Sequence, residues 1–181
     1  MKDIYIEFGS SADIKGETND AKHKPANAVE VSSFTHVIRQ PKSATASSAG
    51  GHTAERTEHG ELLFTKDIDK ATPKLLQACS AGTIYPSVVI YFYRAVGGSN
   101  TTATSTNNRV NYLKIELKNV LVSSVSTAIA DEAIPTETFG LKYSAIRWTY
   151  NQSKMDGSGI ESSGNNIQGM YSLSANTPTF G

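Results

Sequence analysis

The segment "YLKIELK" (residues 112–118) decides the fold, because from Leu113 onward its side chains alternate between apolar and charged. Leu113, Ile115 and Leu117 share one face of an extended chain, and the charged residues share the other. This alternation is typical of an antiparallel strand with one face buried and one face in water. The segment "IYIEF" (4–8) repeats the pattern, so the chain is predicted to be mainly β.

Two longer candidate strands change the parity of their apolar residues midway. In "VEVSSFTHVI" (29–38) the change falls at Ser32–Ser33, and in "FGLKYSAIRWTY" (139–150) it falls at Ser144–Ala145. A β-bulge at each point would keep one face inward and bend the strand, and bent strands allow a sheet to close into a barrel. Two shorter strands joined by a kink would produce the same pattern, and the sequence leaves both options open.

The segment "VVIYFYR" (88–94) is apolar on both faces. An antiparallel strand of this kind needs cover on both sides. One face can fill a barrel interior. The other face, which carries Tyr91 and Tyr93, is expected to be covered by a helix, by the C-terminal tail or by another copy of the chain.

One helix is predicted over residues 72–81, within "ATPKLLQACSAG" (71–82). Thr72 can serve as the N-cap, Pro73 fits the first helical position, and Gly82 fits the position after the last turn. A helix this short must pack on the sheet to be stable. Its predicted apolar face consists of Leu75, Leu76 and Cys79.

Composition narrows the functional classes. The 181 residues suggest one domain, and the 17 basic residues are balanced by 17 acidic ones, so nothing indicates binding to nucleic acid or anionic lipid. No run approaches the roughly 20 apolar residues of a membrane helix. The N-terminus "MKDIYIEFGS" lacks the apolar stretch of a secretory signal, so we expect synthesis in the cytoplasm without a cleaved signal peptide.

The strongest candidate for chemistry is "HTAERTEH" (52–59), which contains His52, Glu55, Glu58 and His59. On a strand these side chains divide into two per face, which does not close a tetrahedral zinc site, so a solvated strand start is the favoured interpretation. We therefore predict no catalytic residue, no metal and no cofactor. A metal-dependent hydrolase or effector that uses His52 and His59 remains the enzymatic alternative.

Four segments together resemble the haemolysin co-regulated proteins (Hcp), the tube proteins of the bacterial type VI secretion system. They are "VSSFTHVIRQPKSATASSAGGHTAER" (31–56), "LLFTKDIDKATPKLLQACSAG" (62–82), "YLKIELKNVLVSSVS" (112–126) and "ETFGLKYSAIRWTY" (137–150). The resemblance assigns residues 1–151 to an Hcp-like domain and leaves residues 152–181 as a tail rich in Gly, Ser and Asn.

The resemblance implies a closed antiparallel β-barrel, related to phage tail-tube proteins, with one flanking helix. It implies a non-enzymatic subunit that forms homo-hexameric rings, which stack into a hollow tube and are expelled into a target cell. The implied partners are other copies of the chain, the spike, the sheath and baseplate components, and small effectors in the lumen. Such a protein is secreted through the type VI system. A monomeric β-domain that binds a ligand remains a further alternative.

The resemblance also gives a role to the long hairpin loop "QPKSATASSAGGHTAER" (40–56), which would project along the tube axis and contact the next ring. Small side chains allow close approach of two backbones, and Gly50 and Gly51 allow the loop to reverse. The residues expected in this ring-stacking contact are Arg39, Gln40, Pro41, Lys42, Ser43, Thr45, Ser47, Ser48, Gly50, Gly51 and His52. The candidates for contacts within a ring are Tyr91, Tyr93, Val120 and Val122.

Overall fold

Antiparallel strands form nearly all of the structure, which is a computed structural model that describes residues 3–9, 12–41, 56–95, 109–131, 133–152, 154 and 165–180. The elements within these residues are β1 (Asp3–Glu7), β2 (Val29–Val31), β3 (Ser33–Thr35), β4 (Ile38–Arg39), β5 (Glu58–His59), β6 (Leu62–Asp67), α1 (Thr72–Ala81), β7 (Ile84–Ala95), β8 (Arg109–Ala128), β9 (Thr136–Lys142), β10 (Ala145–Tyr150) and β11 (Ile167–Ser172). The prediction of a mainly β chain with one helix is correct for this part of the chain. Among the described residues, no helix is long and apolar enough to cross a membrane.

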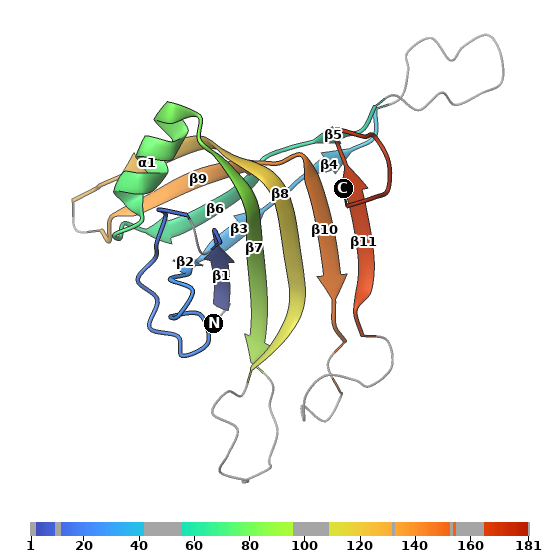
Figure 1. The fold of residues 1–181 in the computed structure, drawn as a ribbon. Coiled ribbons are helices and arrows are strands. Elements are labelled where there is room, and N and C mark those ends of the chain that lie inside the picture. Colours follow the sequence, from blue (N-terminus) through green and yellow to red (C-terminus); the bar gives the residue numbers. More distant parts are fainter. Residues whose placement is uncertain are drawn as a thin grey trace, which may run out of the picture.

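The main sheet has the strand order β2-β1-β7-β8-β9-β6-β3, and β10 and β11 branch from it (Figure 1). The long strand β8 connects the branch to the main sheet. Its first half pairs with both β7 and β10, and its second half pairs with β9. Asn119 lies between these halves and has a positive φ of 48°. Its side-chain amide donates to the hydroxyl of Ser144 at 3.0 Å, which fixes the corner where β9 ends and β10 begins.

The sheet is strongly curled, and its two end strands, β2 and β3, are neighbours in the chain (Figure 1). Ser32 separates them, and both its backbone N–H and its hydroxyl donate to the carbonyl of Thr65 on β6, at 2.8 and 3.0 Å. Within the described residues, however, no ladder joins β2 to β6. The strand pairing therefore gives a curled sheet and does not by itself confirm a closed barrel.

The two parity changes in the sequence are breaks between strands. Ser32 divides β2 from β3, and Tyr143 and Ser144 divide β9 from β10, so the bulges predicted there are wrong and the kinked alternative is correct. Register shifts occur elsewhere, between Phe92 and Tyr93 in the β7–β8 pair and between Val122 and Ser124 in the β8–β9 pair. These irregularities are compatible with a strand as long as β8 following a curved surface.

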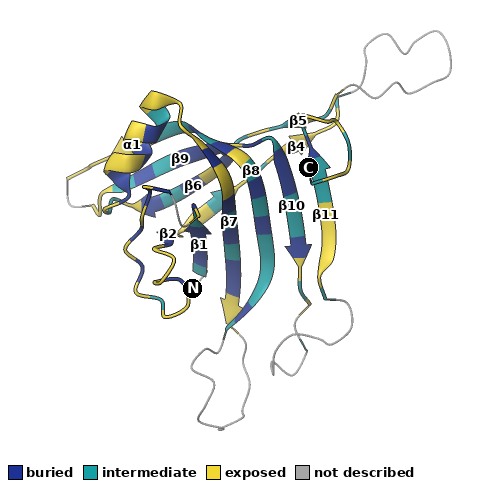
Figure 2. Cartoon of the chain, in the orientation of Figure 1, coloured by how far each residue is buried: buried dark blue, intermediate teal, exposed yellow. Residues whose placement is uncertain are grey.

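The core fills the concave side of the curled sheet. Figure 2 shows buried positions recurring along β7, β8, β9 and β10, as expected from the alternation in the sequence. Each fully buried Leu, Ile or Phe side chain contributes about 1.5–3 kcal/mol relative to an exposed one. The largest of these apolar side chains are Ile6, Leu62, Phe64, Leu75, Ile90, Ile115, Leu117, Phe139, Leu141 and Ile146.

Helix α1 covers the core at one end of the sheet and differs from its prediction in two respects. Ala71, not Thr72, occupies the N-cap position, and no side chain caps the helix there. Thr72 is the first helical residue, Pro73 follows it, and the Thr72 hydroxyl donates to Glu137 on β9 at 2.9 Å. Gly82 ends the helix in the left-handed conformation, with a φ of 63°.

The apolar face of α1 also differs from the prediction. Leu75 and Ala78 are buried and Cys79 is half-buried against the core, but Leu76 is 42% exposed. The buried helical positions recur every three residues, and the residue after Leu75 is turned away by about 100°. The prediction that Leu76 belongs to the apolar face is therefore wrong.

The described part of the C-terminal tail joins the sheet as strand β11, a pairing that the sequence does not predict. Strand β11 pairs along the whole of β10, and Tyr171 and Leu173 pack against the core. Phe180 lies beside two cationic side chains. Its ring centroid is 4.8 Å from Nζ of Lys118 and 4.5 Å from Cζ of Arg147. We call residues 165–180 the C-terminal segment. This segment therefore contributes β11 to the main sheet.

Candidate assembly surface

The root of the long hairpin loop is a small two-stranded sheet formed by β4 and β5, which lies near the end of β11 (Figure 1). Ile38 faces His59 and Arg39 faces Glu58 across this pair, and the Thr57 hydroxyl donates to the Arg39 carbonyl at 3.2 Å. Arg39 and Gln40 are exposed, and Pro41 is half-buried. The other predicted stacking residues lie outside the described residues: Lys42, Ser43, Thr45, Ser47, Ser48, Gly50, Gly51 and His52.

Behind this root, two histidines share one tyrosine hydroxyl. The Tyr143 oxygen lies 2.7 Å from Nδ1 of His59 and 3.0 Å from Nε2 of His36. Burial lowers the pKa of both histidines, and the neighbouring His59 lowers the pKa of His36 further. Burial raises the pKa of Tyr143. We call these three residues the His–Tyr–His cluster.

The cluster does not resemble a metal centre. Among the described residues there is no group of three or more His, Cys, Asp or Glu side chains able to hold an ion. His59 uses Nδ1 for Tyr143 and stacks on the ring of Tyr171, with ring centroids 5.5 Å apart. His52, the other histidine of the enzymatic alternative, lies outside the described residues.

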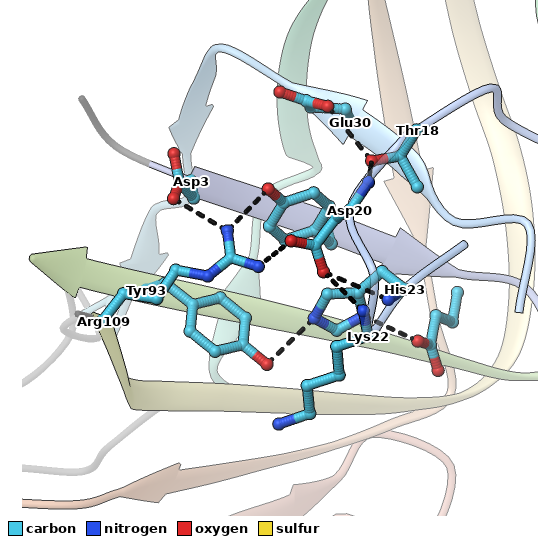
Figure 3. Close-up of polar contacts among 10 residues, drawn as sticks. Asp3, Thr18, Asp20, Lys22, His23, Glu30, Tyr93 and Arg109 are labelled. Carbon is cyan, nitrogen blue, oxygen red and sulfur yellow. Dashed lines mark hydrogen bonds and ion pairs between the residues drawn. The ribbon is translucent and has the colours of Figure 1, made fainter. Parts of the chain in front are cut away.

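The second face of β7 is covered by the loop of residues 12–28, whereas the sequence predicted cover from the helix, the tail or another copy. Tyr93 is 5% exposed and packs with Tyr5 and Ala28, and Tyr91 is half-buried against the same cluster. His23 of the loop lies 2.9 Å from the Tyr93 hydroxyl through Nε2 (Figure 3). Tyr93 is therefore buried within the subunit and offers little surface for contact with a neighbouring subunit.

Polar contacts fix this loop on the sheet. His23 Nδ1 lies 2.9 Å from the carboxylate of Glu7 and its ring stacks on Tyr5, with centroids 4.5 Å apart. Burial, and then the nearby Glu7 carboxylate, raise the pKa of Tyr91 to about 12. The apolar second face of β7 was the only sequence signal that some segment must cover it.

Arg109 at the start of β8 closes the same region. Its guanidinium donates to Asp3 and to the Tyr5 hydroxyl, both at 2.9 Å, and it pairs with Asp20 of the loop (Figure 3). The guanidinium also lies over the ring of Tyr93, 4.9 Å from its centroid. Charge-assisted bonds of this kind are stronger than neutral ones, so the loop is held firmly on the outer face of β7.

Val120 and Val122 are 0% and 1% exposed and lie in the core, so their side chains offer no surface to a neighbouring subunit. Ile115 and Leu117, at odd positions, point inward before Asn119, and the even-numbered valines point inward after it. The left-handed conformation of Asn119 accounts for this change of face. The large apolar side chains that are exposed instead are Val37, Ile38, Leu63, Leu76, Ile84, Ile129, Ile134, Tyr150 and Ile167.

Two of these exposed side chains lie at an open sheet edge. Tyr150 and Ile167 face each other across β10 and β11, and they are 40% and 58% exposed. Among the described strands, β11 pairs only with β10, so its outer edge is open except at Ser172, which bridges to Thr177. An open edge with adjoining apolar side chains is a favourable site for another strand. The segment "IQGMYS" has no alternation of apolar and polar residues that would predict this edge.

Comparison with known proteins matches the chain to one family. The family model described as "Type VI secretion system effector, Hcp" matches residues 5–150. The chain is 36% identical to Protein hcp1 of Pseudomonas aeruginosa over 156 residues, which cover 86% of each chain.

Solved structures agree with this match. Hcp1 from Salmonella typhimurium is 25% identical, with a TM-score of 0.73 over 98% of this chain and 99% of that one. A structure described as a type six secretion system protein has the same fold, with 23% identity and a TM-score of 0.80 over the same shares of the two chains. The chain therefore belongs to the Hcp family of the type VI secretion system.

Proposed function

We propose that this protein is a structural, non-enzymatic subunit of the type VI secretion tube. It is made in the cytoplasm, forms homo-hexameric rings of closed barrels, and is expelled with the tube into a target cell. The observation that supports this proposal is the family match over residues 5–150, which includes the helix, both strands at the loop root and all of the curled sheet except β11 and the start of β1. The spike, the sheath and baseplate components, and small effectors in the lumen are the partners of such a subunit.

The surface is compatible with ring formation. Head-to-tail contacts close into a ring when the rotation between neighbours closes, and they require two different complementary surfaces on each copy. The open edge of β11, with Tyr150 and Ile167 beside it, supplies one apolar surface with unpaired backbone groups. A net charge near zero places no strong repulsion between identical copies.

Stacking of rings is assigned to the long hairpin loop. Its root projects from the main sheet as the separate β4–β5 pair, with Arg39 and Gln40 exposed. We expect the contact of a single loop with the next ring to be weak by itself. Contacts repeated around a ring add through multivalency, which suits a tube that must assemble and later come apart.

The mass of the purified protein in solution and negative-stain images test the proposal together. We expect rings of one defined diameter and a mass that is a fixed multiple of the 19.4 kDa chain. A monomer at every concentration would contradict the tube and favour the ligand-binding alternative. Stoichiometric zinc together with hydrolytic turnover would favour the enzymatic alternative instead.

Replacing both Gly50 and Gly51 by proline is expected to reduce stacking and secretion while the fold and the rings remain. Proline fixes φ near −65° and removes a backbone donor, so the loop can no longer reverse as two glycines allow. Sedimentation and electron microscopy measure stacking, and circular dichroism measures the fold. Loss of the β signal in this variant would show that the loop supports the core and would contradict its assignment to stacking.

A further inference from the structure

We infer that the His–Tyr–His cluster is an acid-sensitive latch that holds the root of the long loop against the C-terminal segment. The latch is closed at neutral pH and opens in mild acid. The inference concerns contacts within one subunit, so it does not depend on ring or tube formation. It is based on a shared proton, on the neutral state of two imidazoles and on the convergence of two chain segments at one place.

The shared proton limits the charge that the cluster can accept. Tyr143 has one hydroxyl hydrogen and lies within hydrogen-bond distance of a nitrogen on His36 and a nitrogen on His59. Each neutral imidazole has one N–H and one bare nitrogen. Two neutral rings therefore satisfy the hydroxyl in either direction, one ring donating to its oxygen and the other accepting its hydrogen.

Double protonation breaks this arrangement. Both nitrogens would then donate to the Tyr143 oxygen, and the hydroxyl hydrogen would lose its acceptor in the cluster. Two positive rings would also repel each other, because the centroids of His36 and His59 are 6.1 Å apart. An unsatisfied donor in a half-buried site, combined with like charge, favours separation of the rings.

The surroundings favour neutral rings. Burial lowers the pKa of both histidines and outweighs the backbone of Gly60, which acts on His36 in the opposite direction. The rings that face the two histidines are Phe34, Tyr143 and Tyr171.

The charged side chains on the neighbouring elements leave the two rings without a carboxylate partner. Those residues are Arg39 on β4, Arg56 and Glu58 at β5, Glu61 before β6 and Lys142 on β9. Lys142 lies 3.6 Å from the carboxylate of Glu61, which also accepts from Ser124. Among the described residues, no carboxylate bonds to either imidazole.

The cluster joins two distant parts of the chain. His59 stacks on Tyr171 of β11, and the guanidinium of Arg56 donates to the carbonyl of Leu173. The backbone N–H of Leu173 donates to the carbonyl of Ser144 at 2.8 Å, directly after Tyr143. Separation of the two imidazoles would therefore loosen both the β4–β5 root and the C-terminal segment.

The direction of the pH effect follows from the lowered pKa values. Rings released from the latch regain the ordinary histidine pKa of 6.5 and bind protons more readily than latched rings. The stabilising contribution of the latch is therefore complete above about pH 6.5 and is lost as the pH falls below that value.

Local hydrogen exchange tests the latch in the intact protein. Between pH 7.5 and 5.5, after correction for the intrinsic rate, we expect the amides of residues 165–177 to exchange at least about fivefold faster, while the amides of β7 and β8 are unchanged. The only tryptophan, Trp148, pairs with Gly169 of β11, so its fluorescence should change over the same pH range. Equal acceleration in the core, or no acceleration in the C-terminal segment, would overturn the inference.

Neutral variants separate the latch from other effects of acid. His36→Gln and His59→Asn place an amide nitrogen or oxygen near the positions of Nε2 and Nδ1 without a group that titrates. We expect the double variant to lose the acid response, and each single variant to reduce it. His23→Gln is the matched control in the other histidine environment and should keep the response. An undiminished response in the double variant would overturn the inference, as would its loss in His23→Gln alone.

Discussion

Replacing Leu75 by aspartate is expected to abolish folding of the subunit. Leu75 lies on the buried face of α1, and its side chain is 0% exposed and packs in the main core. The change removes a packed apolar side chain, which alone costs about 2–5 kcal/mol when Leu becomes Ala, and it adds a buried charge with no partner. The whole free energy of unfolding of a domain is about 5–15 kcal/mol. Soluble yield and the far-ultraviolet circular dichroism spectrum measure the outcome.

The next residue provides a matched control for this variant. Leu76 is 42% exposed, so Leu76→Asp introduces the same carboxylate on the same helix without burying it. We expect its free energy of unfolding to remain within about 0.5 kcal/mol of the wild type. If Leu75→Asp melts at the wild-type temperature, or if both variants fail equally, α1 does not cover the core as described.

The predictability of the strands depended on how strongly one face is buried. Around "YLKIELK" the alternation of apolar and charged residues reports the buried face directly, and Ile115 and Leu117 lie in the core. Strand β11 has no such pattern, because its first three residues are exposed and only Ser172 is buried. Its pairing with β10 supplies the backbone hydrogen bonds, and the sequence does not encode that partner locally.

Tyr93, Val120 and Val122 are buried within the subunit for two different physical reasons. The alternation that places Ile115 and Leu117 inward shifts by one residue at Asn119, whose positive φ accounts for the burial of the two valines that follow it. Tyr93 was correctly placed on the second face of β7, but its cover comes from His23, which is 70 residues away in the chain. Contacts of that separation leave no periodic signal in either segment.

No local sequence pattern predicts the His–Tyr–His cluster. His36 and Tyr143 are separated by 107 residues, and each follows a strand that has just ended. His59 was noticed only as one of several possible metal ligands close together in the sequence. The fold instead places it beside a hydroxyl and an aromatic ring, which favour a neutral imidazole.

Replacing Lys66 by methionine is expected to lower the free energy of unfolding by about 3–5 kcal/mol, because it leaves a buried carboxylate without its cation. Lys66 on β6 and Glu137 on β9 are directly opposite in the antiparallel pair, and each residue is 1% exposed. The Lys66 ammonium donates to Glu137 at 2.8 Å and to Asp69 at 2.7 Å. Urea unfolding at one fixed protein concentration measures the loss.

Neutralising the partner distinguishes an unpaired charge from lost packing as the cause. In Lys66→Met/Glu137→Gln the charge is gone, and the glutamine carbonyl can still accept the hydroxyl of Thr72 that anchors the start of α1. We expect this double variant to regain at least about 2 kcal/mol over Lys66→Met. Lys74→Met, at a lysine that is 45% exposed on the same helix, should change the free energy by less than about 0.5 kcal/mol. If the double variant is no more stable than Lys66→Met, the cost lies in packing at the junction of β6 and α1, and the ion pair is not what holds the helix on the sheet.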